Sequence, residues 1–162
     1  MTARRAIEIP TNGITLRGVV QGSGPLVLMV HGFPEGWHSW RHQLQPIADA
    51  GFTACAVDVR GYGGSSKPPA VADYTLAQIT ADIAGAAAHL QPGAPAILVG
   101  HDWGAPIVWN TALTRPDRVR AAVRYRGRAH HPQCGSAAVA GGRVQPRRPG
   151  RSHDGGRHRH RA

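Results

Sequence analysis

The stretch Val99-Gly100-His101-Asp102-Trp103-Gly104 decides how the rest of the chain is interpreted. An apolar run precedes it and a helical pattern begins at its end, so Asp102 lies in a strand-to-helix turn with a glycine two residues away on either side. Such a tight turn admits only small residues at those positions, and the helix start supplies backbone N–H groups beside the aspartate. The spacing is typical of a nucleophile elbow. The alternative is an ordinary turn in which Asp102 caps the helix.

The segments around this turn alternate between strand and helix patterns. Uninterrupted apolar runs such as Leu26–Val30 indicate strands buried on both faces of a parallel sheet. The predicted strands are 6–10, 14–20, 26–30, 53–59, 96–99 and 119–123; the predicted helices are 37–50, 75–90 with Asp73 as its cap, and 104–113. This order predicts an α/β fold with a parallel sheet.

Charge is distributed unevenly along the chain. Residues 1–123 carry nine Lys and Arg against eight Asp and Glu, whereas residues 124–162 carry ten Arg against Asp154 alone, so the second part contributes +9 of the net charge of +10. Every Trp, Phe, Leu and Ile precedes residue 124. We therefore expect an α/β core domain over 1–123 and a disordered basic tail over 124–162, because the tail has too little apolar surface to fold. One hypothesis for the abrupt change is an out-of-frame translation of the tail.

Two further motifs follow the predicted strands. His31-Gly32-Phe33-Pro34 comes after strand 26–30, where the backbone N–H of Phe33, together with that of Trp103, is placed to stabilise an oxyanion. Arg60–Pro68 is a glycine-rich loop that lacks the residue order of a phosphate-binding loop. The alternative for the loop His31–Pro34 is a plain turn built from Gly and Pro, and Arg60–Pro68 is in isolation only a weak signal.

In this order the three motifs resemble the epoxide hydrolase branch of the α/β-hydrolase fold. The likeness covers about residues 7–123. It is carried by His31-Gly32-Phe33-Pro34-Glu35, by Asp58–Gly63 and by His101-Asp102-Trp103-Gly104. The segment Pro116–Val119 is also similar to the family's segment after the nucleophile helix.

The resemblance implies a two-step reaction without a metal or cofactor. Asp102 would open a small-molecule epoxide by attack on carbon, and water would then hydrolyse the ester to a diol. The backbone N–H groups of Phe33 and Trp103 would form the oxyanion hole. The residues implied to support these two loops are His31, Gly32, Pro34, Gly100, His101 and Gly104.

The same resemblance implies parts that this sequence does not supply. The family's base is a histidine near the end of a chain about twice as long, oriented by a second acid, and two tyrosines come from a cap domain. Tyr125 and His153 fall in the predicted tail and match none of these positions. We therefore expect an incomplete fold, an unpaired last strand at 119–123, and little or no turnover.

Other functions stay open beside this one. Haloalkane dehalogenases resemble the same elbow but usually have Asn where Phe33 stands, and fluoroacetate dehalogenases have Arg where Trp103 stands. A basic nucleic-acid-binding fragment is the alternative of another class, although the tail has no interleaved aromatic residues to stack on bases. We expect no nucleic-acid or membrane partner. Two cysteines and the lack of a long apolar segment favour a cytoplasmic location.

Overall fold

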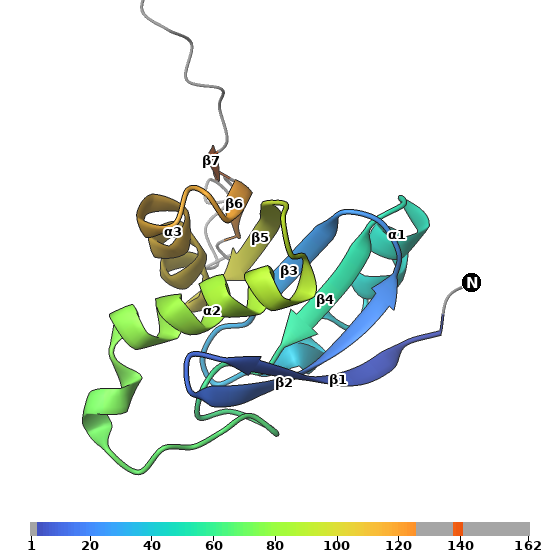
Figure 1. The fold of residues 1–162 in the computed structure, drawn as a ribbon. Coiled ribbons are helices and arrows are strands. Elements are labelled where there is room, and N and C mark those ends of the chain that lie inside the picture. Colours follow the sequence, from blue (N-terminus) through green and yellow to red (C-terminus); the bar gives the residue numbers. More distant parts are fainter. Residues whose placement is uncertain (1–2, 126–137, 141–162) are drawn as a thin grey trace, which may run out of the picture.

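The computed structural model describes residues 3–125 and 138–140 of the chain. They form a seven-stranded sheet in the order β1-β2-β4-β3-β5-β6-β7 (Figure 1). The strands are β1 (Arg5–Thr11), β2 (Ile14–Gly22), β3 (Leu26–Val30), β4 (Thr53–Val57), β5 (Ala96–His101), β6 (Val119–Tyr125) and β7 (Ala138–Ala140). The α-helices are α1 (Leu44–Asp49), α2 (Leu76–Leu90) and α3 (Gly104–Thr114), and two 3-10 helices are η1 (Trp37–Trp40) and η2 (Val71–Tyr74).

The sheet is mixed, and its parallel centre confirms the predicted α/β fold. The central strands β4, β3, β5 and β6 pair in parallel, as expected for an α/β fold. β2 instead pairs antiparallel with both β1 and β4. Asn12 and Gly13 both have positive φ, and a two-residue turn of this kind brings β2 back antiparallel against β1.

Strand β3 lies at the centre of the core, and all five of its side chains are buried. Leu28 packs toward one face of the sheet, with residues of α2 and α3, and Met29 packs toward the other face, with Leu44 of α1. Helices α2 and α3 therefore cover one side and α1 covers part of the opposite side (Figure 1). Burial on both faces explains why this strand is a continuous apolar run.

Two predicted helix features are wrong. The expected helix 37–50 is split into η1 and α1, because Pro46 has no N–H and would leave an unmade hydrogen bond inside a continuous helix. Asp73 does not cap α2, since it lies within η2. The cap is Thr75, whose hydroxyl oxygen accepts a hydrogen bond from the backbone N–H of Gln78.

The last described strands differ from expectation. β6 continues to Tyr125, beyond the predicted domain boundary at residue 123. It is not an unpaired edge, because β7 pairs antiparallel with Ala122–Arg124. The other residues of the predicted tail lie outside the described residues.

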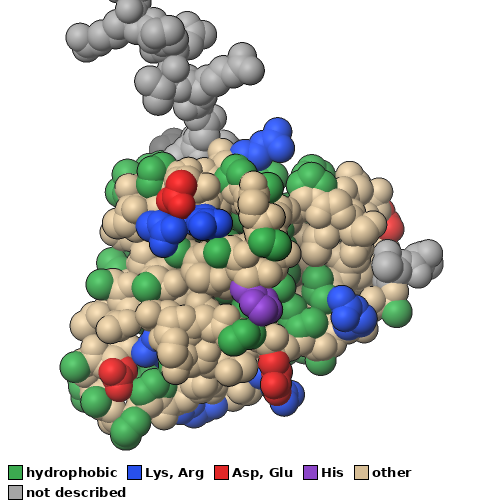
Figure 2. Space-filling model, viewed as in Figure 1, with side chains coloured by type: hydrophobic (Ala, Val, Ile, Leu, Met, Phe, Trp, Pro, Cys, Tyr) green, Lys and Arg blue, Asp and Glu red, His purple; other side chains and the backbone are tan. Residues whose placement is uncertain are grey.

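The described part of the chain has no helix that is both long and apolar enough to cross a membrane. On the face shown in Figure 2, acidic and basic side chains are interspersed among hydrophobic ones. This face therefore offers no extended surface of one charge sign of the kind that a polyanion would require.

Candidate active site

Asp102 occupies a strained turn between β5 and α3. Its φ is 50°, a left-handed conformation that residues other than glycine rarely adopt. Its backbone N–H donates to the carbonyl of Tyr125 at 3.4 Å, and its carbonyl accepts from the N–H of Ala105 at 3.0 Å. The N-cap of α3 is Trp103, which makes no side-chain capping bond. Asp102 is therefore not the N-cap residue of α3.

The glycines around the turn are required by close packing. A Cβ at Gly104 would collide with the carbonyl oxygens of Val30 and His31, and one at Gly100 would collide with the backbone of Gly104 and Ala105. A Cβ at Gly32 would come within 2.5 Å of the Cβ of Asp102. The two loops are therefore in contact, and each leaves room only for hydrogen at these positions.

The carboxylate of Asp102 accepts a hydrogen bond from the other loop. The backbone N–H of Phe33 donates to Oδ2 at 3.0 Å. This bond, followed by the backbone N–H of Trp103 and the charge of His101, holds the pKa of the Asp102 carboxyl below its ordinary value. The three residues predicted to act together are thus brought together, with one carboxylate oxygen bound and Asp102 kept ionised.

The surroundings of this carboxylate are open. Asp102 is exposed, and the side chains of Phe33 and Trp103 are each 63% exposed. Large apolar side chains at this level of exposure are typical of a surface that contacts a ligand or another part of a protein.

A fixed histidine anchors the loop that carries Phe33. The His31 side chain is buried, and its Nε2 accepts from the N–H of Val59 at 2.9 Å. Nδ1, 2.8 Å from the carbonyl of Gly32, must therefore carry the proton. Burial lowers the pKa of His31, which favours this neutral form.

Glu35 joins the two loops of the site, a role that the sequence motif alone did not predict. Its Oε2 accepts from the N–H of Gly32 at 3.2 Å and lies 3.3 Å from Nδ1 of His101. His101 therefore interacts with Glu35, away from the carboxylate of Asp102.

Asp58 is a second residue whose role sequence reasoning missed. It is buried, and its carboxylate accepts from the N–H groups of Trp37 at 2.8 Å and Gly64 at 3.1 Å. It joins the segment after His31 to the glycine-rich loop, which places that loop in a structural role. A buried carboxylate is stable only when paired in this way, so the position of Asp58 after a buried strand was the available signal.

Asp102 and His101 line different cavities. Asp102 lines one of about 260 Å³, with Ala105, Pro106, Trp109, Asn110 and Arg124. His101 lines one of about 200 Å³, with Glu35, Ser39, Trp40, Gln43 and Tyr125. Arg124 and Tyr125 were assigned to the tail from the sequence, but β6 carries both of them to the site. Continuation of the strand pattern past Val123 was the signal that could have revealed this.

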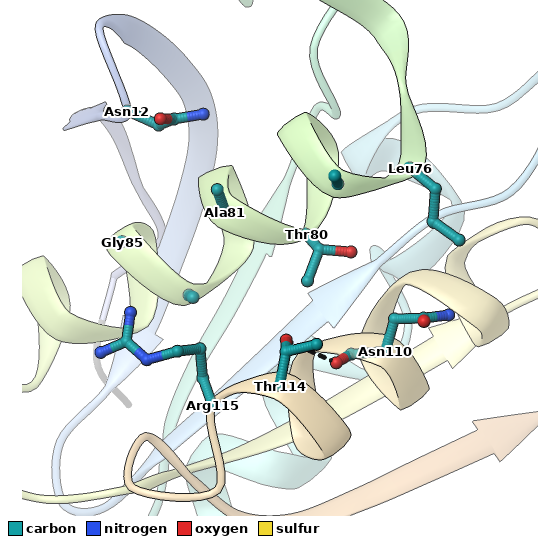
Figure 3. Close-up of a pocket in the computed structure, with 10 residues that line it drawn as sticks. Asn12, Leu76, Thr80, Ala81, Gly85, Asn110, Thr114 and Arg115 are labelled. Carbon is teal, nitrogen blue, oxygen red and sulfur yellow. Dashed lines mark hydrogen bonds between the residues drawn. The ribbon is translucent and has the colours of Figure 1, made fainter.

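A larger cleft of about 690 Å³ lies between α2 and α3 and shares only Asn110 with the cavity that Asp102 lines. Figure 3 shows Thr80 from α2 and Asn110 and Thr114 from α3 along it, with Arg115 at one end. Its lining residues include neither Asp102 nor any histidine, cysteine or carboxylate. Asp102 therefore lines the smaller cavity and not this cleft.

The described residues also form no cluster of three metal-ligating side chains.

The chain is similar to epoxide hydrolases in sequence and structure. It is 50% identical over 114 residues to an epoxide hydrolase of Caballeronia sordidicola, covering 70% of this chain and 34% of that protein. It is 49% identical over 116 residues to epoxide hydrolase A of Mycobacterium tuberculosis, covering 70% and 35%. The crystal structure of epoxide hydrolase A from Mycobacterium thermoresistibile matches with a TM-score of 0.70 and 45% identity, covering 77% of this chain and 39% of that one.

The extent of these matches fits the described fold. The chain spans little more than a third of the length of the curated relatives named above. Residues 25–129 match the model of the alpha/beta hydrolase fold family, a range that includes both loops of the site, β5, α3 and β6. The chain therefore belongs to the alpha/beta hydrolase fold family, with epoxide hydrolases among its relatives.

Proposed function

We propose that this chain carries the nucleophilic half of an epoxide hydrolase site and that Asp102 is its nucleophile. The observation that supports this most directly is the hydrogen bond from the Phe33 N–H to Oδ2 of Asp102 at 3.0 Å. With Oδ2 held, Oδ1 is the oxygen that attacks. It forms a bond to an epoxide carbon, the ring C–O bond breaks with its electron pair going to oxygen, and that oxygen takes a proton from water.

The second step would use the same donors. When water adds to the ester carbonyl, negative charge develops on Oδ2, to which the N–H of Phe33 already donates, and the N–H of Trp103 also interacts with this carboxyl group. Activation of the water requires a base. Both ring nitrogens of His31 are hydrogen-bonded and buried, and His101 faces Glu35. We therefore propose that the ester forms and persists, because a positioned base contributes roughly 10²–10⁴ in rate.

The dehalogenase alternative is less well supported. Halide release requires donors near the leaving group, and Phe33 has only a backbone N–H, which already binds Asp102. An epoxide oxygen can instead be protonated by water at this exposed site.

The absence of nucleic-acid partners and a cytoplasmic location are further proposals that rest on the sequence.

The test is a reaction with styrene oxide followed by intact-mass spectrometry. The wild-type chain should gain the mass of one epoxide, and Asp102→Asn, which keeps the shape but removes the charge, should not. A full-length relative serves as the positive control for the reagent. Equal modification of the wild-type chain and of Asp102→Asn would show that Asp102 is not the nucleophile.

A further inference from the structure

We infer that Arg124 forms an anion subsite beside Asp102 and that the substrate class of this site is an epoxide bearing a carboxylate. This inference rests on the proposed function, since it assigns the substrate of the same nucleophile. Its basis is that Asp102 and Arg124 line one cavity of about 260 Å³, so a small molecule that fills the cavity lies against both charges.

The guanidinium of Arg124 is oriented by an aromatic neighbour. Its Cζ lies 5.2 Å from the centre of the Trp109 ring, in the distance range of a cation–π contact. Stacking against a ring leaves the N–H groups at the edge of the guanidinium plane free. Such a planar edge matches the two oxygens of a carboxylate.

No carboxylate of the described residues forms an ion pair with Arg124, and Asp102 shares its cavity without such a pair. Among the described residues, the carboxylates of Glu8, Glu35, Asp82 and Asp117 pair with other cationic side chains, and none pairs with Arg124. His101, which adjoins Asp102, differs from Arg124 because it has a carboxylate partner, Glu35. An exposed arginine that lines a cavity without a carboxylate partner is free to bind an anionic ligand.

The order of elements explains why the two charges meet. β6 pairs in parallel with β5, with Arg124 opposite Gly100, so the carboxyl end of β6 lies next to the elbow. Ligands of open α/β sheets bind at the carboxyl ends of the strands. A molecule with an electrophilic carbon a few bonds from a carboxylate satisfies both residues, the carbon facing Asp102 and the anion facing Arg124.

The first experiment compares matched epoxides on the full chain. Glycidate and 3,4-epoxybutanoate are each paired with their primary amide, and formation of the Asp102 ester is followed by intact mass. Changing Arg124→Gln should lower the carboxylate rate relative to the amide rate by about twofold to fivefold, the range for a partly exposed ion pair. Arg124→Lys should retain part of the preference, and added salt should reduce it in the wild type.

The second experiment needs no reaction at Asp102. Cyclopropanecarboxylate has the shape of glycidate but no ring oxygen to open, and cyclopropanecarboxamide is its neutral match. The carboxylate alone should shift the indole N–H resonance of Trp109, assigned with Trp109→Phe, and Arg124→Gln should abolish the shift.

The outcomes separate the two claims. If no epoxide modifies Asp102, the proposed function fails while the resonance shift still decides the anion subsite. If the amides modify Asp102 as the proposed function requires, but Arg124→Gln leaves the carboxylate preference and the Trp109 shift unchanged, the anion subsite is wrong and the nucleophile stands.

Discussion

Asp102 combines two properties that a nucleophilic carboxylate needs. Its backbone is held at a positive φ, which presents the side chain at the end of the sheet, and its Oδ2 accepts a hydrogen bond from the backbone N–H of Phe33. The hydrogen bond to Phe33 lowers the pKa and fixes the carboxylate orientation at the same time. The residue is thus ionised and oriented before a substrate arrives.

The lowered pKa of Asp102 predicts the pH dependence of ester formation. Ionisation favours attack, and a carboxyl whose pKa is below the ordinary value stays ionised above about pH 5. The rate should therefore be constant between about pH 5 and pH 8 and should fall only in more acidic solution. Intact mass against pH measures this, with Asp102→Asn subtracted to remove acid-catalysed opening. A rate that climbs through the neutral range would identify another nucleophile.

At the scale of elements, the β5–α3 junction depends on the missing side chain of Gly104. We predict that Gly104→Ala destabilises the fold by about 1–3 kcal/mol through overpacking and abolishes Asp102 ester formation, because the new Cβ would push α3 away from β3. Thermal unfolding and intact mass give the two measurements.

Gly93→Ala is the matched control for this change. Gly93 differs from Gly104 in having a positive φ, of 83°, and it has no atom within 4 Å of its potential Cβ. It should lose some stability from backbone strain and keep ester formation. Unchanged reactivity in Gly104→Ala would show that the close packing of the elbow is not needed for attack.

The ion pair between Arg60 and Asp82 joins α2 to the loop after β4. Arg60 donates from Nε and Nη2 to the two oxygens of Asp82, each at 2.7 Å, and both side chains are almost fully buried. Asp82→Asn should lower the free energy of unfolding by about 3–5 kcal/mol, because the guanidinium would stay buried without its counter-charge. Urea unfolding measures the change.

Asp117→Asn provides the comparison for Asp82, since Asp117 pairs with Arg115 and Arg118 on the surface. Exposed pairs of this kind contribute little, so the midpoint of unfolding should hardly move. Similar losses in both variants would contradict a special role for the buried pair.

The parts of the fold that followed from local pattern were predictable. Apolar runs located the central strands, and the glycine spacing located the elbow. What could not be predicted depended on contacts between distant segments. Asp58 accepts backbone N–H groups from two distant segments, and Glu35 contacts His101 on the other loop. The antiparallel pairing of β2 with β4 has no local signal.

The end of β6 also could not be predicted from local pattern. Arg124 and Tyr125 were assigned to the tail from composition, yet their pairing with Gly100 and His101 of β5 continues the strand. The composition of a segment does not show whether its first residues pair with a neighbouring strand, because the neighbouring strand sets that pairing. Two residues that line the site's cavities were therefore missed.

At the scale of the molecule, the proposed nucleophile Asp102 and the residues around it are exposed. Phe33, Trp103 and Tyr125 are exposed large side chains at or beside the two loops. The chain covers 39% of the related crystal structure named above. The elbow and its oxyanion donors are nevertheless held by contacts within the described residues. The proposed attack by Asp102 can therefore be tested in this chain separately from the release of product.

The most direct measurement is peptide mapping of the chain after a single exposure to styrene oxide. The account predicts one persistent ester on Asp102 and none on Cys55, because burial raises the pKa of that thiol to about 12 and keeps it protonated. Modification of other residues with Asp102 untouched, in a chain whose folding is verified by circular dichroism, would contradict the central claim that this elbow is a working nucleophile.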